Sequence, residues 1–320
     1  MLVVLDKTPF YAESGGQVGD TGVITIGETE VEVTNTTKDH AGIFMHAGVV
    51  TKGSFAVDDC AVASIDAERR MAIMRNHTAA HLLQAALRQV LGNHVEQAGS
   101  FVNEEICRFD FTHFAALTSE EIAAVEALVN ANILVANGIV TMETDIETAK
   151  KHGAMALFGE KYGKTVRMVK MGNFSTELCG GTHCDNTGKI GLFKIISESS
   201  VAAGVRRIEA VTGLGVLNLI ASKDALINSA ASELKVPNPT DIAKRASQLQ
   251  SELRDAKKEI EALNSKLAAS KLDGVLNSAK QIKGVKLIAF NAEGMDVDSA
   301  RTLGDKIKAE HSDTVAVLAV

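Results

Sequence analysis

Residues 67–91 read AERRMAIMRNHTAAHLLQAALRQVL, and their apolar side chains recur with the period of an α-helix. Gly92 follows this stretch, and glycine commonly ends helices. The pattern therefore predicts one long helix with an apolar face. The side chains on that face are Met71, Met74, Ala79, Leu82, Ala86 and Val90.

The residues before this helix have the composition of a small β-structure. Glycine, threonine and valine are frequent, and runs such as Val23–Ile26 and Val31–Val33 lie between turn-forming glycines. We expect residues 1–64 to form a small β-barrel-like subdomain.

The residues after the helix mix strands with a second helix. Thr118 and Glu121 form a capping box, which predicts a helix running to about residue 137. Strands are expected at 107–111, 139–146, 166–171, 191–199 and 207–212. This mixture favours an α+β fold, with an α/β two-layer domain over residues 65–213.

Beyond residue 214 the chain is rich in alanine, leucine, lysine and glutamate, and its apolar residues follow a heptad pattern. The heptad seam comprises Ile242, Ala246, Leu249, Leu253, Ala256, Ile260, Leu263 and Leu267. This seam could pack against a helix at 215–235 or against another chain. We expect a helical linker at 214–272 and a partial α/β C-terminal domain at 273–320, with strands at 285–290 and 314–320 and a helix at 298–311.

Length and composition restrict the class of protein. The 320 residues exceed what one hydrophobic core usually serves, so several domains are expected. No apolar run approaches the ~18 residues of a membrane span, and no signal peptide is recognisable, so we expect no membrane partner and a cytoplasmic location. Four cysteines in such a chain argue against a disulfide scaffold.

The net charge of −7 gives no general preference for nucleic acids, so contact with a polyanion requires a local basic patch. From Lys150 to Lys170, six basic residues accompany one acidic residue. This segment is either such a patch or a solvated face.

Two pairs of residues have the chemistry and spacing of metal ligands. His77 and His81 lie four residues apart and share a helix face. Cys179 and His183 flank a pair of glycines, which let the backbone bend so that thiolate and imidazole converge. Together the four complete a tetrahedral nitrogen and sulfur set that favours Zn²⁺ over cations that prefer oxygen.

The neighbouring residues limit what this metal site can be. A zinc protease of the H-E-x-x-H type needs glutamate after the first histidine, and Thr78 stands there. We expect Cys184 to pack and not to bind metal. The remaining histidines have no second ligand at useful spacing and are interpreted as ordinary surface or core residues: His40, His46, His94, His113 and His152.

The order and spacing of five motifs closely resemble the editing half of bacterial alanyl-tRNA synthetase. The motifs are Glu13-Ser14-Gly15-Gly16-Gln17, Gly19-Asp20-Thr21-Gly22, Arg75-Asn76-His77-Thr78-Ala79-Ala80-His81, Cys179-Gly180-Gly181-Thr182-His183 and Gly204-Val205-Arg206-Arg207-Ile208-Glu209. The resemblance covers nearly the whole chain. Nothing in the sequence corresponds to the class II aminoacylation core with its ATP-binding motifs, so we expect a fragment that does not aminoacylate.

This resemblance implies hydrolysis of tRNA(Ala) mischarged with serine or glycine, with His77, His81, Cys179 and His183 as zinc ligands. Zinc can polarise the substrate or lower the pKa of bound water toward ~7. Four protein ligands usually mark a structural site. Either one ligand yields to water or substrate, or zinc positions the substrate; we favour positioning, because no separate general base is recognisable.

The resemblance also implies a pocket that hydrogen-bonds the hydroxyl of serine and thereby spares alanine. Gln97 is the leading candidate, although it could be a surface amide, and Ser100 is the second. The other pocket candidates are Gly180, Gly181 and Thr182.

Expected contacts to tRNA come from a polar loop and from basic residues. They are Glu13, Gly15, Gly16, Gln17, Lys161, Lys164, Arg206 and Arg207. The loop could instead be a simple turn, and the arginines could be charges at a sheet edge.

Two other functions stay open at this point. One is a zinc-stabilised module that binds tRNA and dimerises without turnover, and the other is a free-standing trans-editing protein. A homodimer through the helical or C-terminal region is also possible. The heptad helix followed by an incomplete domain fits a synthetase fragment better than a free-standing protein.

Overall fold

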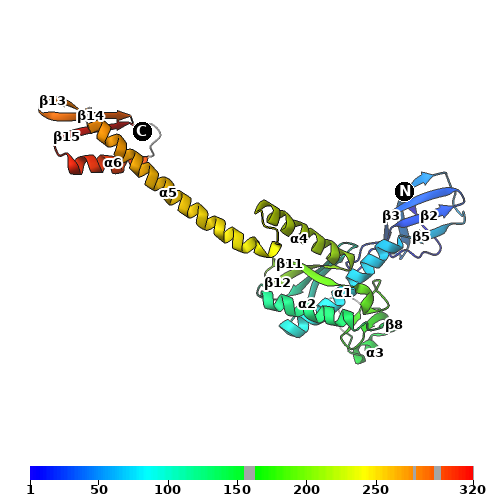
Figure 1. Cartoon of the computed structure of the whole chain (residues 1–320). Coiled ribbons are helices and arrows are strands. Elements are labelled where there is room, and N and C mark those ends of the chain that lie inside the picture. Colours follow the sequence, from blue (N-terminus) through cyan, green and yellow to red (C-terminus); the bar gives the residue numbers. More distant parts are fainter. Residues whose placement is uncertain (155–162, 277–278, 292–296, 320) are drawn as a thin grey trace. The chain divides into compact units, whose positions relative to one another are not determined.

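The computed structural model describes residues 1–154, 163–276, 279–291 and 297–319. The chain divides into two compact units, Met1–Ser222 and Lys223–Val320 (Figure 1). Both units contain helices and strands, so the predicted α+β class is confirmed. The finer division into four domains stays a prediction.

An antiparallel sheet forms the N-terminal part of the first unit. Its strands are β1 (Leu2–Val3), β2 (Gly22–Ile26), β3 (Thr29–Lys38), β4 (Phe44–Lys52) and β5 (Val62–Ile65), in the order β1-β4-β3-β2-β5. Alternate side chains of β3, such as Val31 and Val33, are buried against Ile24 and Phe10. The two-residue strand β1 and strand β5 are at the ends of this strand order, and the predicted barrel-like form of the subdomain stays a prediction.

The predicted long helix is α1 (Ala67–Leu91). Asp66 caps its N-terminus by accepting a hydrogen bond from Arg69 N, and Gly92 N donates to Arg88 O where the helix ends. Its fully buried apolar side chains are Ile73, Ala79, Leu82, Leu83, Ala86 and Leu87.

A second sheet and helix α2 pack around α1. The strands are β6 (Gln97–Val102), β7 (Cys107–Thr112), β11 (Phe193–Ala202) and β12 (Val205–Thr212), in the order β11-β12-β7-β6. Helix α2 (Ser119–Leu134) begins with the predicted capping box between Thr118 and Glu121. Leu82 of α1, Val125 of α2 and Phe109 of the sheet belong to one buried core.

A third sheet carries the second half of the metal motif. Its strands are β8 (Ile139–Asp145), β9 (Thr165–Met171) and β10 (Ser175–Leu178), in the order β10-β9-β8, and α3 (Ile146–Lys151) follows β8. Strand β11 begins two residues later than the sequence predicted. The reason is a 3₁₀ helix at Thr187–Ile190 that ends at Gly191, which has a φ of 80°.

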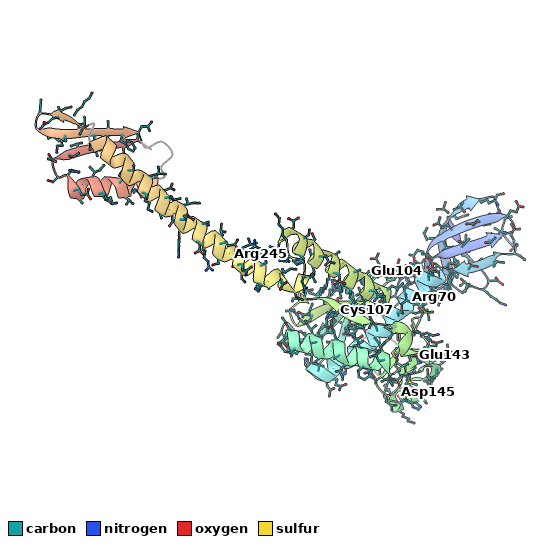
Figure 2. The ribbon with its side chains drawn as sticks, in the orientation of Figure 1. Arg70, Glu104, Cys107, Glu143, Asp145 and Arg245 are labelled. Carbon is teal, nitrogen blue, oxygen red and sulfur yellow. The ribbon has the colours of Figure 1, made fainter. Side chains whose placement is uncertain are left out.

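A buried ion pair joins the N-terminal sheet to α1. Arg70 Nε donates to Asp20 Oδ1 at 2.8 Å, and its Nη2 contacts the other carboxylate oxygen. Asp20 is 1% exposed and also accepts a hydrogen bond from Tyr11 N at 2.6 Å. Figure 2 labels Arg70 at the end of α1 that lies next to the N-terminal strands. This contact brings the loop at residues 13–17 toward α1.

Helices dominate the part of the chain that follows β12. The elements are α4 (Leu214–Glu233), a 3₁₀ helix (Pro239–Asp241), α5 (Ile242–Leu276), β13 (Lys280–Ile282), β14 (Val285–Asn291), α6 (Val297–Glu310) and β15 (Thr314–Ala319). Strand β14 pairs with β13 antiparallel and with β15 parallel. Ile288, Leu303 and Ile307 form a small core with this sheet. Val320, where the last strand was predicted to end, lies outside the described residues.

The heptad residues lie on α5, one continuous helix on which Figure 2 labels Arg245. Their side chains are largely exposed: Leu249 is 36%, Leu263 50% and Leu253 58% accessible. Among the described residues of the second unit, nothing covers these three side chains, and the partner of the seam stays a prediction.

None of the helices in the described parts of the chain is long and apolar enough to cross a membrane.

Candidate metal centre

The four predicted ligands lie together although they come from distant parts of the chain. The ligand atoms of His77, His81, Cys179 and His183 all lie within 4.8 Å of one another. The two α1 histidines lie one turn apart on one face, and Cys179 directly follows strand β10. All three histidines are buried, and Cys179 is half-buried.

Two of the distances between these atoms fit a tetrahedral zinc ion. Cys179 Sγ lies 3.4 Å from His77 Nε2 and 3.3 Å from His183 Nε2. Zn–S and Zn–N bonds of ~2.3 and ~2.0 Å at tetrahedral angles place sulfur and nitrogen about 3.5 Å apart. His81 Nε2 is buried, and among the described residues no partner accepts or donates a hydrogen bond there. The donor set thus fits Zn²⁺, as the sequence predicted; the identity of the metal stays a prediction.

Two residues outside the ligand set orient the α1 histidines. Gln17 is fully buried, and its Oε1 accepts hydrogen bonds from Thr182 N at 2.8 Å and from His77 Nδ1 at 2.7 Å. The Glu177 carboxylate faces His81 Nδ1 at 2.6 Å. Because both Nδ1 atoms donate, both Nε2 atoms are left free to bind a metal.

The loop from Cys179 to His183 is fixed from both sides. Arg167 Nη1 donates to the carbonyl oxygens of Cys179 at 2.8 Å and Gly181 at 2.6 Å. A Cβ on Gly181 would overlap the ring of His77. Neither Gly180 nor Gly181 has a positive φ. The need for glycine at 181 is therefore close packing, and not the sharp bend that the sequence suggested.

The electrostatics of the cluster suit a cation. Burial would raise the pKa of the Cys179 thiol, but His77 and His81 lower it far below its usual value. Burial, reinforced by His77, lowers the pKa of His183 to about 3. Burial opposes charge on His81, but the Glu177 carboxylate and the Cys179 sulfur raise its pKa well above normal. A thiolate and neutral imidazoles are the forms that bind zinc, so Cys179 and His183 have the required form, whereas His81 must release a proton when a metal binds.

A small pocket opens onto this cluster and contains both residues expected to recognise serine. It has a volume of about 30 Å³, and Gln97 and Ser100 line it together with Gly15. The volume accommodates a group about as large as a water molecule. The other lining residues are His77, Ala80, His81, Gln84, Phe109, Glu177, Leu178 and Cys179.

Glu177 and Gln84 were missed by sequence reasoning, although each has a recognisable position. Glu177 precedes Cys179 by two residues, so the two share a face if β10 continues in extended form. Gln84 follows His81 by three residues and His77 by seven, which places it on the histidine face of α1. Gln84 is 4% exposed and Glu177 3%.

The chain is similar to known tRNA synthetases. A family model described as "Threonyl and Alanyl tRNA synthetase second additional domain" matches residues 166–209, and one described as "tRNA synthetases class II (A)" matches residues 1–69. Alanine-tRNA ligase 1 of Lachnoclostridium phytofermentans is 51% identical over 317 residues. The chain belongs to the alanyl-tRNA synthetase family.

Two further alanine-tRNA ligases, from Acetivibrio thermocellus and Bordetella petrii, are 49% and 48% identical over 318 residues. Each of the three alignments covers 99% of this chain and 36% of the relative. The chain thus spans little more than a third of the length of these alanyl-tRNA synthetase relatives.

The loop expected to contact tRNA in the alanyl-tRNA synthetase reading lies against strand β6. Gly15 and Gly16 have φ values of 58° and 82°, and a Cβ on Gly16 would overlap the backbone of Ser100. Glu13 is exposed, as a tRNA contact requires. Gln17 instead is buried beside the metal ligands, because its amide bonds to His77 and Thr182.

The arginines expected to contact tRNA are paired with carboxylates. Arg206 forms a two-point ion pair with Glu198 at 2.5 and 2.6 Å, and Arg207 forms one with Asp110 at 2.7 Å for both bonds. These pairs raise the pKa of both guanidinium groups. Any contact of the arginines with tRNA must use their remaining N–H groups or exchange these partners.

The basic segment is only partly described. Lys164 is exposed, as are Lys150 and Lys151, whereas Lys161 lies outside the described residues. Arg167 belongs to the metal centre through its bonds to the loop carbonyls.

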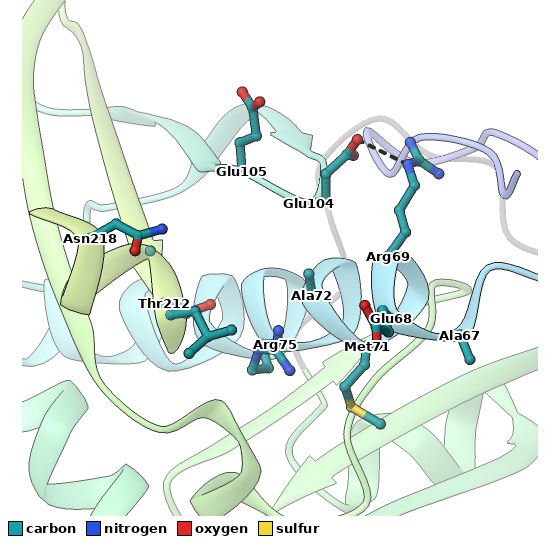
Figure 3. A pocket seen from close by; sticks show the side chains of 12 residues that line it. Ala67, Glu68, Arg69, Met71, Ala72, Arg75, Glu104, Glu105, Thr212 and Asn218 are labelled. Carbon is teal, nitrogen blue, oxygen red and sulfur yellow. Dashed lines mark ion pairs between the residues drawn. The ribbon is translucent and has the colours of Figure 1, made fainter.

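A larger cleft of about 780 Å³ lies elsewhere on the first unit, beside the start of α1 (Figure 3). Its lining includes Arg75, Thr212 and the ion pair of Arg69 with Glu104 at 2.9 Å. None of the four metal-cluster residues lines it, so its size does not make it the candidate site.

Proposed function

We propose that this chain hydrolyses the ester bond of tRNA(Ala) mischarged with serine or glycine. The observation that carries the proposal is the His77, His81, Cys179 and His183 cluster facing a small polar pocket. Membership of the alanyl-tRNA synthetase family supports tRNA(Ala) as the substrate. The reaction adds water across the ester, releasing the free amino acid and the 3′ hydroxyl of the tRNA.

The residues around the pocket divide the work of this reaction. A bound zinc ion would polarise the ester carbonyl or activate water. Glu177 is the single carboxylate among the described lining residues, and it is bound to His81 and to Ser175 Oγ at 3.0 Å. Glu177 therefore orients a ligand, and the other basic side chains that line the pocket belong to the ligand set. This arrangement supports a centre that mainly positions the ester.

Selection of serine over alanine is assigned to Gln97 and Ser100. Both line the pocket, and both can hydrogen-bond a hydroxyl group. A site built around such a bond can discriminate by about 10⁴-fold against a substrate that lacks the hydroxyl. Glycine has no hydroxyl, so its removal would depend on placement of the ester at the cluster and not on this contact.

Contacts with tRNA are assigned to the polar loop and to basic residues. Gly15 lines the pocket, Glu13 and Gly16 belong to the same loop, and Arg206, Arg207, Lys161 and Lys164 supply positive charge. Contacts from these residues to phosphate would position the tRNA without recognising the amino acid.

Hydrolysis of seryl-tRNA(Ala) and alanyl-tRNA(Ala) by the wild-type chain and Gln97→Ala tests the assignment. The wild type should hydrolyse the seryl ester and spare the alanyl ester. Gln97→Ala should reduce this preference by at least about 10-fold with tRNA affinity nearly unchanged. Equal rates on both esters for the wild-type chain would contradict the proposal.

A second candidate is a zinc-stabilised module that binds tRNA without turnover. The four-ligand cluster favours it, because closed sets are typical of structural zinc. It predicts tRNA binding and full zinc content with no seryl-tRNA hydrolysis.

The exposed seam of α5 supports a homodimer. If Leu253 is an a position, Glu252 is a g position and Lys257 an e position of the following heptad. A parallel pair would place Glu252 of one chain near Lys257 of the other, which is the favourable charge pattern. Sedimentation should show a dimer that Leu253→Asp converts to monomer; a monomeric wild type would contradict this.

A further inference from the structure

The ligands of the metal centre differ in how firmly the chain fixes them. His77 and His81 each donate from Nδ1 to a side chain outside the set, namely Gln17 at 2.7 Å and Glu177 at 2.6 Å. Outer hydrogen bonds of this kind fix the tautomer and ring orientation and make the ligating nitrogen more basic. Both imidazoles are therefore oriented by the protein itself.

Cys179 is fixed through its backbone and its sulfur. Its N–H donates to Arg167 O at 3.0 Å, and its carbonyl accepts from Arg167 Nη1 at 2.8 Å. Gly181 N lies 3.4 Å from Sγ and donates to it. The thiolate thus has a set position that does not depend on the other ligands.

His183 has no such support. It is 9% exposed and its Nδ1 is buried, yet no hydrogen-bond partner reaches that nitrogen from the described part of the chain. Its Nε2 faces Cys179 Sγ at 3.3 Å. Buried polar atoms without partners are rare, and a ligand without the outer bond is less basic and less well oriented.

The pocket provides an independent observation. His77, His81 and Cys179 line it, whereas His183 does not. In a tetrahedral set, any three ligands form the face opposite the fourth. A group that reaches the centre from the pocket therefore meets the face of His77, His81 and Cys179, and approaches opposite to His183.

We propose that His183 is the exchangeable ligand of this centre, which gives way when a group enters from the pocket, while His77, His81 and Cys179 retain the ion. The inference rests on the proposed hydrolysis, since that reaction brings an ester to the pocket. It explains how a centre with four protein ligands can admit a substrate without losing its metal. Gln17 and Glu177 are then positioning residues for the retained ligands.

The proposal predicts that His183 contributes less to zinc affinity than the three retained ligands. Zinc affinity of the whole chain, measured by competition with a chromophoric chelator, tests this without any tRNA. His183→Ala should raise the zinc Kd by about 10-fold, and His81→Ala and Cys179→Ala each by at least about 1000-fold. A His183→Ala Kd raised as much as that of His81→Ala would overturn the proposal.

The outer bonds are tested in the same assay. Gln17→Met and Glu177→Met remove the bonds at nearly constant side-chain size and should each raise the Kd by about 10- to 100-fold. Gln89→Met, at an exposed position of α1, is the matched control and should leave it unchanged. Unchanged affinity in both positioning variants would contradict the proposed difference in support.

Lower zinc affinity of a variant could also arise from misfolding, so a further test uses the wild-type chain with cobalt in place of zinc. Serine hydroxamate should change the ligand-field bands and retain the thiolate-to-cobalt band. It should also shift one paramagnetic histidine NMR signal, the one that His183→Gln lacks. Loss of the thiolate band, a shift of the His77 or His81 signals instead, or unchanged spectra would overturn the proposal. Failure of the proposed function would be distinguishable, as absent seryl-tRNA hydrolysis with the zinc affinity order intact.

Discussion

Helices α1 and α5 carry the same kind of sequence signal and differ in what covers it. Both are long, at 25 and 35 residues, and both repeat apolar residues at helical spacing. Leu82 and Leu83 of α1 are fully buried, whereas Leu253 and Leu267 of α5 are each 58% exposed. Periodicity thus predicts a helix and its apolar face, but it does not identify what packs against that face.

Polar residues within the buried part of α1 mark its second difference from α5. His77, His81 and Gln84 are 6%, 8% and 4% exposed. Burying polar groups costs free energy unless they are bonded, so their presence inside a packed face indicates a site. The described polar side chains of α5 are exposed or half-buried, as expected of a helix without such a site.

The largest expected effect is the loss of a metal ligand, which should disturb the region around α1 and leave α5 unchanged. Cys179→Ala should lower seryl-tRNA hydrolysis by at least about 1000-fold, because it removes the thiolate that completes the centre. Hydrogen exchange should increase in α1 peptides and stay unchanged in α5. Cys184→Ala is the matched control: this neighbouring thiol is 2% exposed and lies outside the cluster, so zinc content should be retained. Full hydrolysis by Cys179→Ala would refute the ligand assignment.

The next effect tests the packing difference directly. Leu83→Ala should lower the free energy of unfolding by about 3 kcal/mol, because it leaves a cavity in a closed core. Leu253→Ala, in α5, should cost less than about 1 kcal/mol at concentrations where the chain is monomeric. Urea unfolding followed by circular dichroism measures both. Equal losses would mean that the α5 seam is packed within the chain.

Close packing inside the metal centre should give a smaller effect. Gly181→Ala introduces a Cβ into the ring of His77 and should weaken zinc binding by about 10- to 100-fold. Gly180→Ala is the matched control, since no atom lies within 4 Å of its added Cβ and its φ is not positive. Chelator competition should separate the two variants. Equal zinc affinities would show that the loop relaxes without disturbing His77.

The smallest expected effect concerns the basic segment from Lys150 to Lys170. Replacing Lys161 and Lys164 together by alanine should weaken tRNA binding and reduce its salt slope by about 1 to 2. The preference for serine over alanine should be unchanged, because phosphate contacts do not read the amino acid. Binding titrations at several salt concentrations measure the slope. A changed amino-acid preference would show that the segment belongs to the pocket.

Much of the fold could be predicted because local signals determine it. Helix α1, the capping box at Thr118 and the strands around Val169 and Ile208 follow from periodicity and capping. The strand order of the N-terminal sheet did not follow, since it depends on which distant strands pair. The exposure of the α5 seam could not be predicted either, because it depends on what packs against the helix and not on the residues of the seam.

The metal ligands could be predicted because their types and spacing are unusual in combination. The residues that orient them could not, for two different reasons. Glu177 was recognisable from strand spacing but has a common residue type, as does the pocket-lining Gln84 on α1. Gln17 lies 60 residues before His77, and its loop reaches α1 through tertiary contacts such as the Asp20–Arg70 ion pair.

Hydrolysis of seryl-tRNA(Ala) before and after metal removal tests the central claim most directly. The wild-type chain should hydrolyse the ester, lose this activity when a chelator removes one metal ion per chain, and regain it when zinc is restored. Cys179→Ala should remain inactive under all three conditions. Undiminished hydrolysis by a chain shown to be free of metal would contradict the account.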